Sequence, residues 1–111
     1  MTILALIGLP LTIVNADAVV EAKTAFALPS RTATVGWQTS WPVNPGAVNI
    51  RLEVAMDETG PWTEIDVTTV VGGEFRTVAV PTAARFIRAR VVTNTGAVLI
   101  TVQIICKVAN P

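Results

Sequence analysis

Histidine is absent from this 111-residue sequence, and its absence removes several mechanisms at once. Without an imidazole there is no Ser/His/Asp triad, no Cys/His pair, no histidine ligand for zinc and no side chain that titrates near neutral pH when unperturbed. Glu64 and Asp66 are the remaining candidates for a catalytic carboxylate pair. They lie two positions apart on one predicted strand, so we expect both to face solvent rather than to flank a glycosidic bond.

Loops that hold phosphate or metal ions are also absent. Gly72 and Gly73 are not followed by the lysine and helix of a phosphate-binding loop. The turn around Asp57 lacks the alternating oxygen ligands of a calcium loop. We therefore expect no enzymatic activity, no cofactor and no bound metal.

Charge and cysteine are scarce. Only 14% of the residues are charged, eight basic and eight acidic, and they are scattered singly, so we expect neither nucleic acid nor a membrane as a partner. Apolar residues reach 51%, which predicts that some apolar surface of so small a domain contacts another protein. The single cysteine, Cys106, cannot form an internal disulfide, and its place in an alternating apolar strand predicts that it is buried.

The N-terminal segment, residues 1–16, carries no charge before Asp17. It lacks the basic start of a signal peptide, and Gly8 and Pro10 interrupt it before it reaches the length of a membrane span. We expect an extended apolar arm or edge strand, followed by one domain over 17–111. The arm packs on the protein's own sheet or on a neighbouring subunit, with a processed leader as a third alternative. Its candidate partner-contacting residues are Ile3, Leu4, Leu6, Ile7, Leu9 and Leu11.

Beyond the arm, apolar and polar residues alternate with a period of two, and turn residues recur about every eight to twelve positions. This pattern predicts an all-β fold, a single antiparallel, jelly-roll-like β-sandwich of about seven or eight strands. Strands are expected within 33–41, 48–56, 63–71, 74–80, 85–93 and 98–108, and 19–28 suits a strand better than a short helix. In the strand at 48–56, we expect Ile50, Leu52, Val54 and Met56 to face inward and Arg51, Glu53 and Ala55 to face outward.

The aromatic residues include three tryptophans but no tyrosine. Trp37 and Trp41 share the parity of Val35 on one predicted strand, which favours core packing. Trp62 follows Pro61 at the mouth of a predicted hairpin, where an indole can fold over the end of the sandwich, anchor an interface or stack on a ligand.

Two arginines, Arg88 and Arg90, lie on the outward face of the strand at 85–93. They are either solvated or paired with Glu53 and Glu64, or they recognise the carboxylate of a partner. We keep Trp62, Arg88 and Arg90 with the arm as candidate interface residues.

The segment LEVAMDETGPWTEID, followed by EFRTVAVPTAARFIRARVVTNTGAVLITVQI, resembles a pattern found in small structural proteins of tailed bacteriophages. The resemblance covers Asn49 to Lys107, just over half of the chain, and contains no catalytic motif. Its fixed points are Asp57, Gly60, Trp62, Phe86, Ile87 and Arg88. More loosely, the same pattern is similar to discoidin-like and galactose-binding β-sandwiches.

The resemblance implies a virion protein of the capsid decoration or cement type, which binds the major capsid protein and stabilises the head lattice. It implies the capsid surface as its location, with the host cytoplasm before assembly, and it allows a homo-oligomer, either a trimer or a network of lattice contacts. A head-to-tail or tail accessory protein is an alternative within this class. From another class, a carbohydrate-binding module that contacts host-surface glycans is the alternative, and it predicts an exposed aromatic platform.

Overall fold

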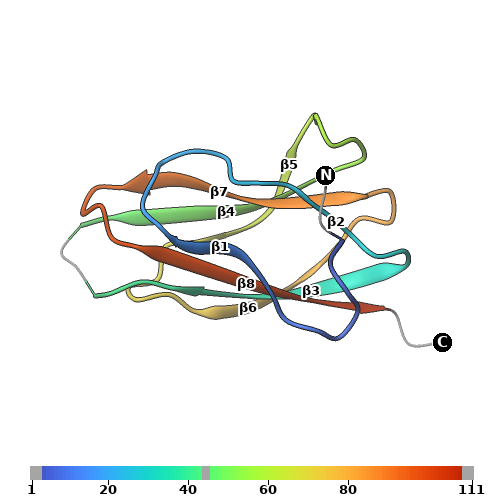
Figure 1. Cartoon of the computed structure of the whole chain (residues 1–111), viewed down its shortest axis with the longest axis horizontal. Helices are drawn as coiled ribbons and strands as arrows, with labels where there is room; N and C mark the ends of the chain where they lie inside the picture. Colours follow the sequence, from blue (N-terminus) through green and yellow to red (C-terminus); the bar gives the residue numbers. More distant parts are fainter. Residues whose placement is uncertain (1–3, 44–45, 109–111) are drawn as a thin grey trace.

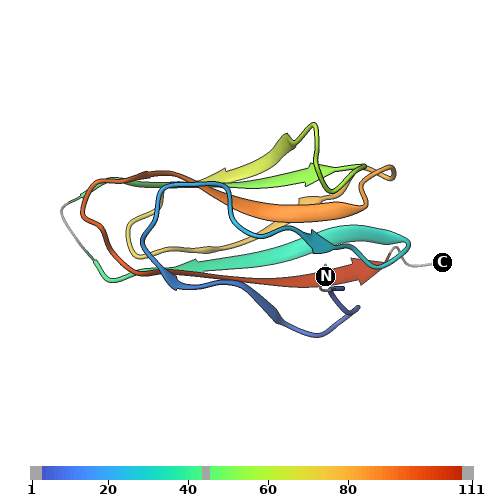
Figure 2. The same ribbon diagram turned by 45° about the horizontal axis from the view of Figure 1, so that its top comes forward.

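The computed structural model describes residues 4–43 and 46–108, which form eight β-strands and no helix (Figure 1). The strands are β1 (Leu11–Asp17), β2 (Phe26–Ala27), β3 (Thr32–Ser40), β4 (Val48–Ala55), β5 (Thr63–Thr68), β6 (Phe75–Ala79), β7 (Phe86–Asn94) and β8 (Ile100–Val108). They form two four-stranded antiparallel sheets that pack face to face (Figure 2). The predicted all-β sandwich is confirmed. In the described part of the chain, no helix has the length and apolar character needed to cross a membrane.

The order of the strands is that of a jelly roll. Sheet 1 has the order β1-β8-β3-β6 and sheet 2 the order β2-β7-β4-β5. The first strand pairs with the last, the second with the second-last, and so on inward: β1 with β8, β2 with β7, β3 with β6 and β4 with β5. The chain therefore behaves as one long hairpin, with its tip between β4 and β5, that is rolled up into a double sheet.

The core lies between the two sheets and follows the alternation of the sequence. The inward-facing apolar residues of the four central strands are all buried: Val35, Trp37, Ile50, Leu52, Val54, Ile87, Ala89, Val91, Ile100, Val102, Ile104 and Cys106. The predicted burial of Trp37 on β3, of Leu52 on β4 and of Cys106 on β8 is thus confirmed. Burial raises the pKa of the Cys106 thiol to about 11, so this residue packs as a small hydrophobe and not as a reactive thiolate.

The predictions for the ends and outer face of β4 are partly wrong. Met56 was expected to face inward, but its side chain is 72% exposed because β4 ends at Ala55 and the chain turns immediately afterwards. Glu53 and Ala55 were expected to face solvent, but both are buried on the outer face. Arg88 covers Glu53, and Ala55 lies in a small hollow with Pro61 and Pro81.

The strand predicted within 19–28 is much shorter than expected. Only Phe26–Ala27 forms a strand, while Ala22 makes an isolated bridge to Arg90. The segment still contributes to the core, because Phe26 and Leu28 are buried.

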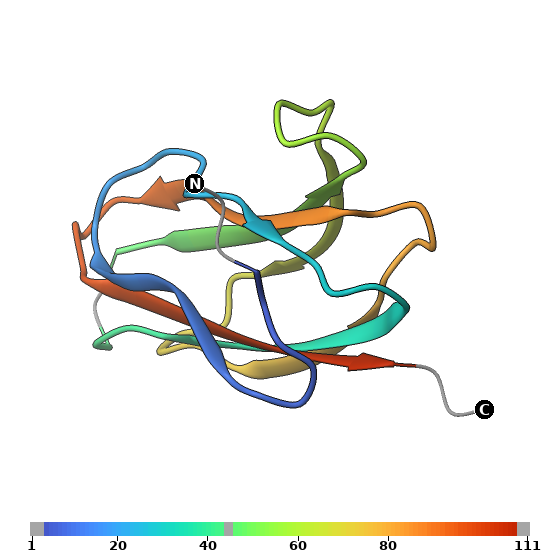
Figure 3. The same ribbon diagram turned by 45° about the vertical axis from the view of Figure 1, so that its right-hand side comes forward.

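The N-terminal segment runs along one long side of the protein's own sandwich (Figure 3). β1 is the edge strand of sheet 1 and pairs with β8. Ahead of β1, the Gly8 amide donates to the Cys106 carbonyl and the Ala5 amide to the Ala27 carbonyl, both at 2.9 Å. Residues 4–9 thus pass from β2 of sheet 2 to β8 of sheet 1, and Ala5 is buried. Ile3 lies outside the described residues.

Candidate functional site

The candidate residues of the N-terminal segment divide into an inner and an outer set. Ala5 faces the core, and Leu11 is half-buried and packs against it. Four apolar side chains point away from the sandwich and are 41% to 56% exposed: Leu4, Leu6, Ile7 and Leu9, which we call the N-terminal ridge. The hydrogen bonds of the segment fix its backbone, so the ridge is a preformed apolar surface and not a loose tail.

Trp62 and Arg88 form one cluster on the outer face of sheet 2. The Arg88 guanidinium carbon lies 4.2 Å from the centroid of the Trp62 ring, within the range of a cation–π contact. Arg88 Nε donates to Glu53 Oε1 at 2.8 Å, and both side chains are largely buried. Of the alternatives left open for Arg88, the structure shows the pairing with Glu53. The guanidinium covers one face of the indole, so this face is closed to a ligand.

The other charged residues of this sheet face are arranged separately. Glu64 pairs with Arg51, with 2.9 Å between Oε1 and Nε, and not with Arg88 or Arg90. Arg90 is exposed and has no ion pair within the described ranges 4–43 and 46–108. The structure therefore does not join Arg88 and Arg90 into one carboxylate-binding fork.

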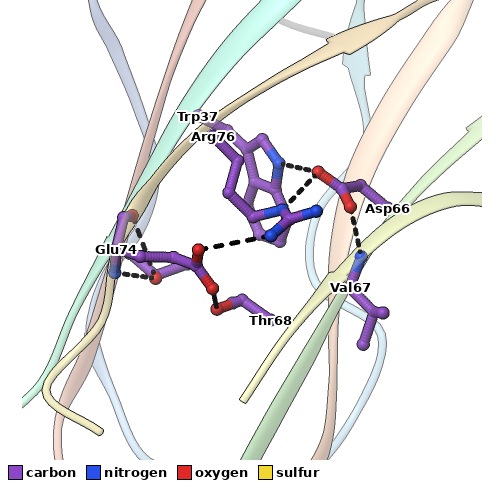
Figure 4. A network of polar contacts seen from close by, with 7 residues as sticks. Trp37, Asp66, Val67, Thr68, Glu74 and Arg76 are labelled. Carbon is purple, nitrogen blue, oxygen red and sulfur yellow. Dashed lines mark hydrogen bonds and ion pairs between the residues drawn. The ribbon is translucent and has the colours of Figure 1, made fainter. Parts of the chain in front are cut away.

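The sequence analysis missed a network of polar contacts that bridges the two sheets (Figure 4). It lies at the β5 and β6 edges, which the strand order places opposite the edges formed by β1 and β2. We call its members, Trp37, Asp66, Thr68, Glu74 and Arg76, the polar clasp. Asp66 Oδ2 accepts from the Trp37 indole at 2.9 Å and from Arg76 Nε at 2.8 Å. Arg76 also donates to Glu74 Oε1 at 3.3 Å, and the Thr68 hydroxyl donates to the other oxygen of Glu74. Trp37 and Arg76 belong to sheet 1, while Asp66 and Thr68 belong to sheet 2.

Asp66 was predicted to face solvent, but it faces inward, and a β-bulge explains the difference. Asp66 pairs with Leu52, whose side chain points into the core, whereas Glu64 pairs with Glu53 on the outer face. One extra residue, Ile65, lies between these two pairs. The insertion turns Asp66 toward the interior while Glu64 stays outside, so the two carboxylates do not share a site.

The clasp holds Asp66 in its ionised form. Burial alone would raise the pKa of Asp66, but hydrogen bonds from Arg76, from the Trp37 indole and from the Val67 amide outweigh burial and lower the pKa below its ordinary value. Such a carboxylate is a poor general acid at neutral pH. The arrangement fits a structural link between sheets. Among the described residues, no three His, Cys, Asp or Glu side chains are placed to hold a metal ion.

The outer face of sheet 1 is almost uncharged and carries one exposed aromatic ring. Phe75 is 63% exposed and belongs to a row that crosses all four strands through Gln38, Gln103 and Thr12. Its ring lies close to Gly36, since a Cβ on that glycine would be 3.2 Å from Phe75 Cζ. The alternation of β6, with Arg76 facing inward and Phe75 facing outward, is the feature of the sequence that indicates this exposed ring. We call Phe75 and its row of polar neighbours the aromatic platform.

Comparison with known proteins shows the fold but no family. No known protein family and no curated protein matches the sequence. The K1 cleaved adhesin domain of Lys-gingipain from Porphyromonas gingivalis W83 is similar in structure, with a TM-score of 0.64, 11% identity and coverage of 78% of this chain and 62% of that chain. The chain thus spans somewhat less than two thirds of that domain.

Two further neighbours match more of the chain. The SPBc2 prophage-derived protein YomS has a TM-score of 0.63 and 14% identity, over 93% of this chain and 99% of that chain. A β-1,3-glucan-binding carbohydrate-binding module of family 6 from Bacillus halodurans has a TM-score of 0.52 and 11% identity, over 88% and 75% of the two chains. The structural neighbours thus include a prophage protein and a carbohydrate-binding module, and at these identities the likeness is one of fold.

Replacement of Asp66 by asparagine tests the clasp. At pH 7 we expect Asp66→Asn to lower the free energy of unfolding by about 1–3 kcal/mol, because it removes the charge-assisted hydrogen bond with Arg76. Since the pKa of Asp66 is lower in the folded state, this stabilisation is present above the pKa of the unfolded chain and is lost as the pH falls through the folded value. The difference between the two proteins should therefore shrink below about pH 4.

Urea unfolding of both proteins between neutral and acidic pH measures this difference. Glu64→Gln is the control, because it removes only the exposed ion pair with Arg51 and should cost less than about 1 kcal/mol. A cost of Asp66→Asn no larger than that of Glu64→Gln would show that the clasp does not link the sheets.

Proposed function

We propose that this protein is a non-catalytic structural component of a bacteriophage particle, which binds the major capsid protein through the N-terminal ridge. The observation that carries the proposal is the ridge itself, four neighbouring apolar side chains held outward by a backbone that is fixed to both sheets. The similarity to a prophage-derived protein over nearly the whole length of both chains supports the phage context.

The physical properties of the ridge suit a contact that is repeated many times. Complete burial of a leucine or isoleucine side chain contributes about 1.5–3 kcal/mol, and about half of each ridge side chain is still available for burial. Each copy would thus gain a few kcal/mol from the ridge. Because the backbone is already ordered, binding costs little conformational entropy. Many such copies on a capsid lattice would add up to substantial mechanical support.

The proposal assigns no catalytic residue. The best-placed charged groups, Arg88 with Glu53 and Asp66 with Arg76, are committed to contacts within the protein. The protein would act at the capsid surface of the virion, after a period in the host cytoplasm, and a trimer or a lattice network would both present the ridge to the shell. A head-to-tail or tail accessory role would use the same ridge on a different partner.

Charge placed on the ridge tests the proposal. We expect Leu6→Asp/Leu9→Asp to reduce the copy number on assembled particles at least tenfold, because burial of a carboxylate in an apolar contact is costly. The control is Val20→Asp/Leu99→Asp, since Val20 and Leu99 match Leu6 and Leu9 in exposure, at 52% and 56%, but lie outside the ridge. Quantitative mass spectrometry of purified particles measures the ratio to the major capsid protein. Equal incorporation of both variants and the wild type would show that the ridge is not the docking surface.

A carbohydrate-binding role is the second candidate, and Phe75 favours it. An exposed aromatic ring in a row of amide and hydroxyl side chains is a surface that can stack on a sugar ring and hydrogen-bond its hydroxyls. The β-1,3-glucan-binding neighbour shows that a sandwich of this fold can support such a function. Under this hypothesis, the ligand would be a glycan of the host surface.

This second role makes its own prediction. If it is correct, Phe75→Ala should abolish saturable binding to a β-1,3-glucan oligosaccharide or to a member of a host-glycan panel, as measured by calorimetry. Trp62→Ala is the matched control and should keep that binding, because Trp62 lies on sheet 2, away from Phe75 on sheet 1, and Arg88 covers one face of its indole. Absence of binding by the wild-type protein across the panel, or equal binding by the Phe75 variant, would show that the aromatic platform around Phe75 does not bind these glycans.

A further inference from the structure

A groove opens at one end of the sandwich, where the connection between β2 and β3 meets the connection between β6 and β7. Its volume is about 620 Å³, within the range of small-molecule sites. Its lining combines apolar, hydroxyl and cationic side chains: Leu28, Pro29, Ser30, Arg31, Thr32, Ala33, Val80, Thr82, Ala84 and Arg85. We call it the arginine groove.

Both arginines of the groove lack an acidic partner among residues 4–43 and 46–108. Four other cations of the protein do have one: Lys23, Arg51, Arg76 and Arg88. Arg31 and Arg85 are both exposed. The Arg85 guanidinium donates to the carbonyl oxygens of Thr82 and Ala84, each at 3.4 Å, and Arg31 makes no ion pair among these residues. Two guanidinium groups on one groove without a carboxylate leave a positive site that an external anion can complete.

The backbone conformation of Arg31 also supports a ligand site at this groove. Its φ of +68° lies in the left-handed region, which costs a non-glycine residue about 1 kcal/mol. The Thr32 hydroxyl donates to the Pro29 carbonyl at 2.7 Å and holds this tight connection closed. A glycine would relieve the strain, yet the position carries an arginine that lines the groove. Strain of this kind is associated with functional positions.

The groove favours a compact ligand over an extended peptide. The strands that border it are already joined, by hydrogen bonds from the Val80 amide to the Ala33 carbonyl at 2.9 Å and from the Leu28 amide to the Arg85 carbonyl at 2.8 Å. No free strand edge is therefore offered in this lining for a peptide to extend.

We infer that the arginine groove binds an acidic sugar, a uronic acid unit. In this assignment the carboxylate pairs with Arg31 and Arg85, the ring hydroxyls meet Ser30 and Thr82, and the apolar face of the ring lies on the floor formed by Leu28 and Val80. This inference is independent of the capsid role, because the groove shares no residue with the N-terminal ridge.

Titration of the full-length, ¹⁵N-labelled protein with D-glucuronate, followed by NMR, tests the inference. We expect saturable shifts of the Leu28, Ser30 and Ala84 amides, with a dissociation constant of about 1 mM. D-glucose, which differs in lacking the carboxylate, should produce no saturable shifts. Arg31→Gln and Arg85→Gln should each weaken glucuronate binding about tenfold or more, the effect of losing one charge-assisted hydrogen bond. Arg90→Gln is the matched control and should bind as the wild type does.

Three further outcomes would overturn the assignment. Equal binding of glucose would show that the arginines do not select the ligand. Inorganic phosphate binding as tightly as glucuronate at the same amides would reduce the groove to a general anion site. An acetylated glutamate peptide binding more tightly than glucuronate would identify an acidic peptide as the ligand. The wild-type shift map locates the site even if an arginine variant fails to fold.

Discussion

The rest of this structure depends on the closure of the two long sides that a jelly roll leaves open. The hydrogen bonds between paired strands join the strands within each sheet, but they do not hold the edge of one sheet to the edge of the other. One side is closed by the N-terminal segment, which hydrogen-bonds to Cys106 of β8 and to Ala27 of β2. The other side is closed by the polar clasp, in which Asp66 of β5 accepts from Trp37 and Arg76 of sheet 1.

The two closures use different chemistry, and the difference has a consequence for function. The clasp satisfies its polar groups internally, so it offers little to a partner. The N-terminal segment satisfies its backbone but leaves Leu4, Leu6 and Leu9 half-exposed. The same segment can therefore complete the fold and present a ready-made apolar surface. The outer sheet faces differ in a similar way, since sheet 2 carries ion pairs such as Arg88 with Glu53 and sheet 1 carries the uncharged row that ends at Phe75.

The strands and the core were predictable because alternation is a local property of the sequence. Ile87, Ala89 and Val91 are buried as their spacing indicates, and Cys106 takes the place of a small hydrophobe. The site was less predictable because it depends on pairing. Asp66 faces inward only because a bulge at Ile65 shifts the register against β4, and a bulge leaves no clear mark in the alternation. The arginine groove joins two loops about fifty residues apart, which only the fold brings together.

The N-terminal segment docks on its own sandwich and thereby presents a preformed ridge. Amide hydrogen exchange of the free protein measures this directly. If the segment is docked in this way, the Ala5 and Gly8 amides, which donate to Ala27 and Cys106, exchange as slowly as the amides of β1. The Leu6 amide, which donates to no partner among the described residues, exchanges far faster. Rapid exchange at Ala5 and Gly8, equal to that of Leu6, would contradict this docking.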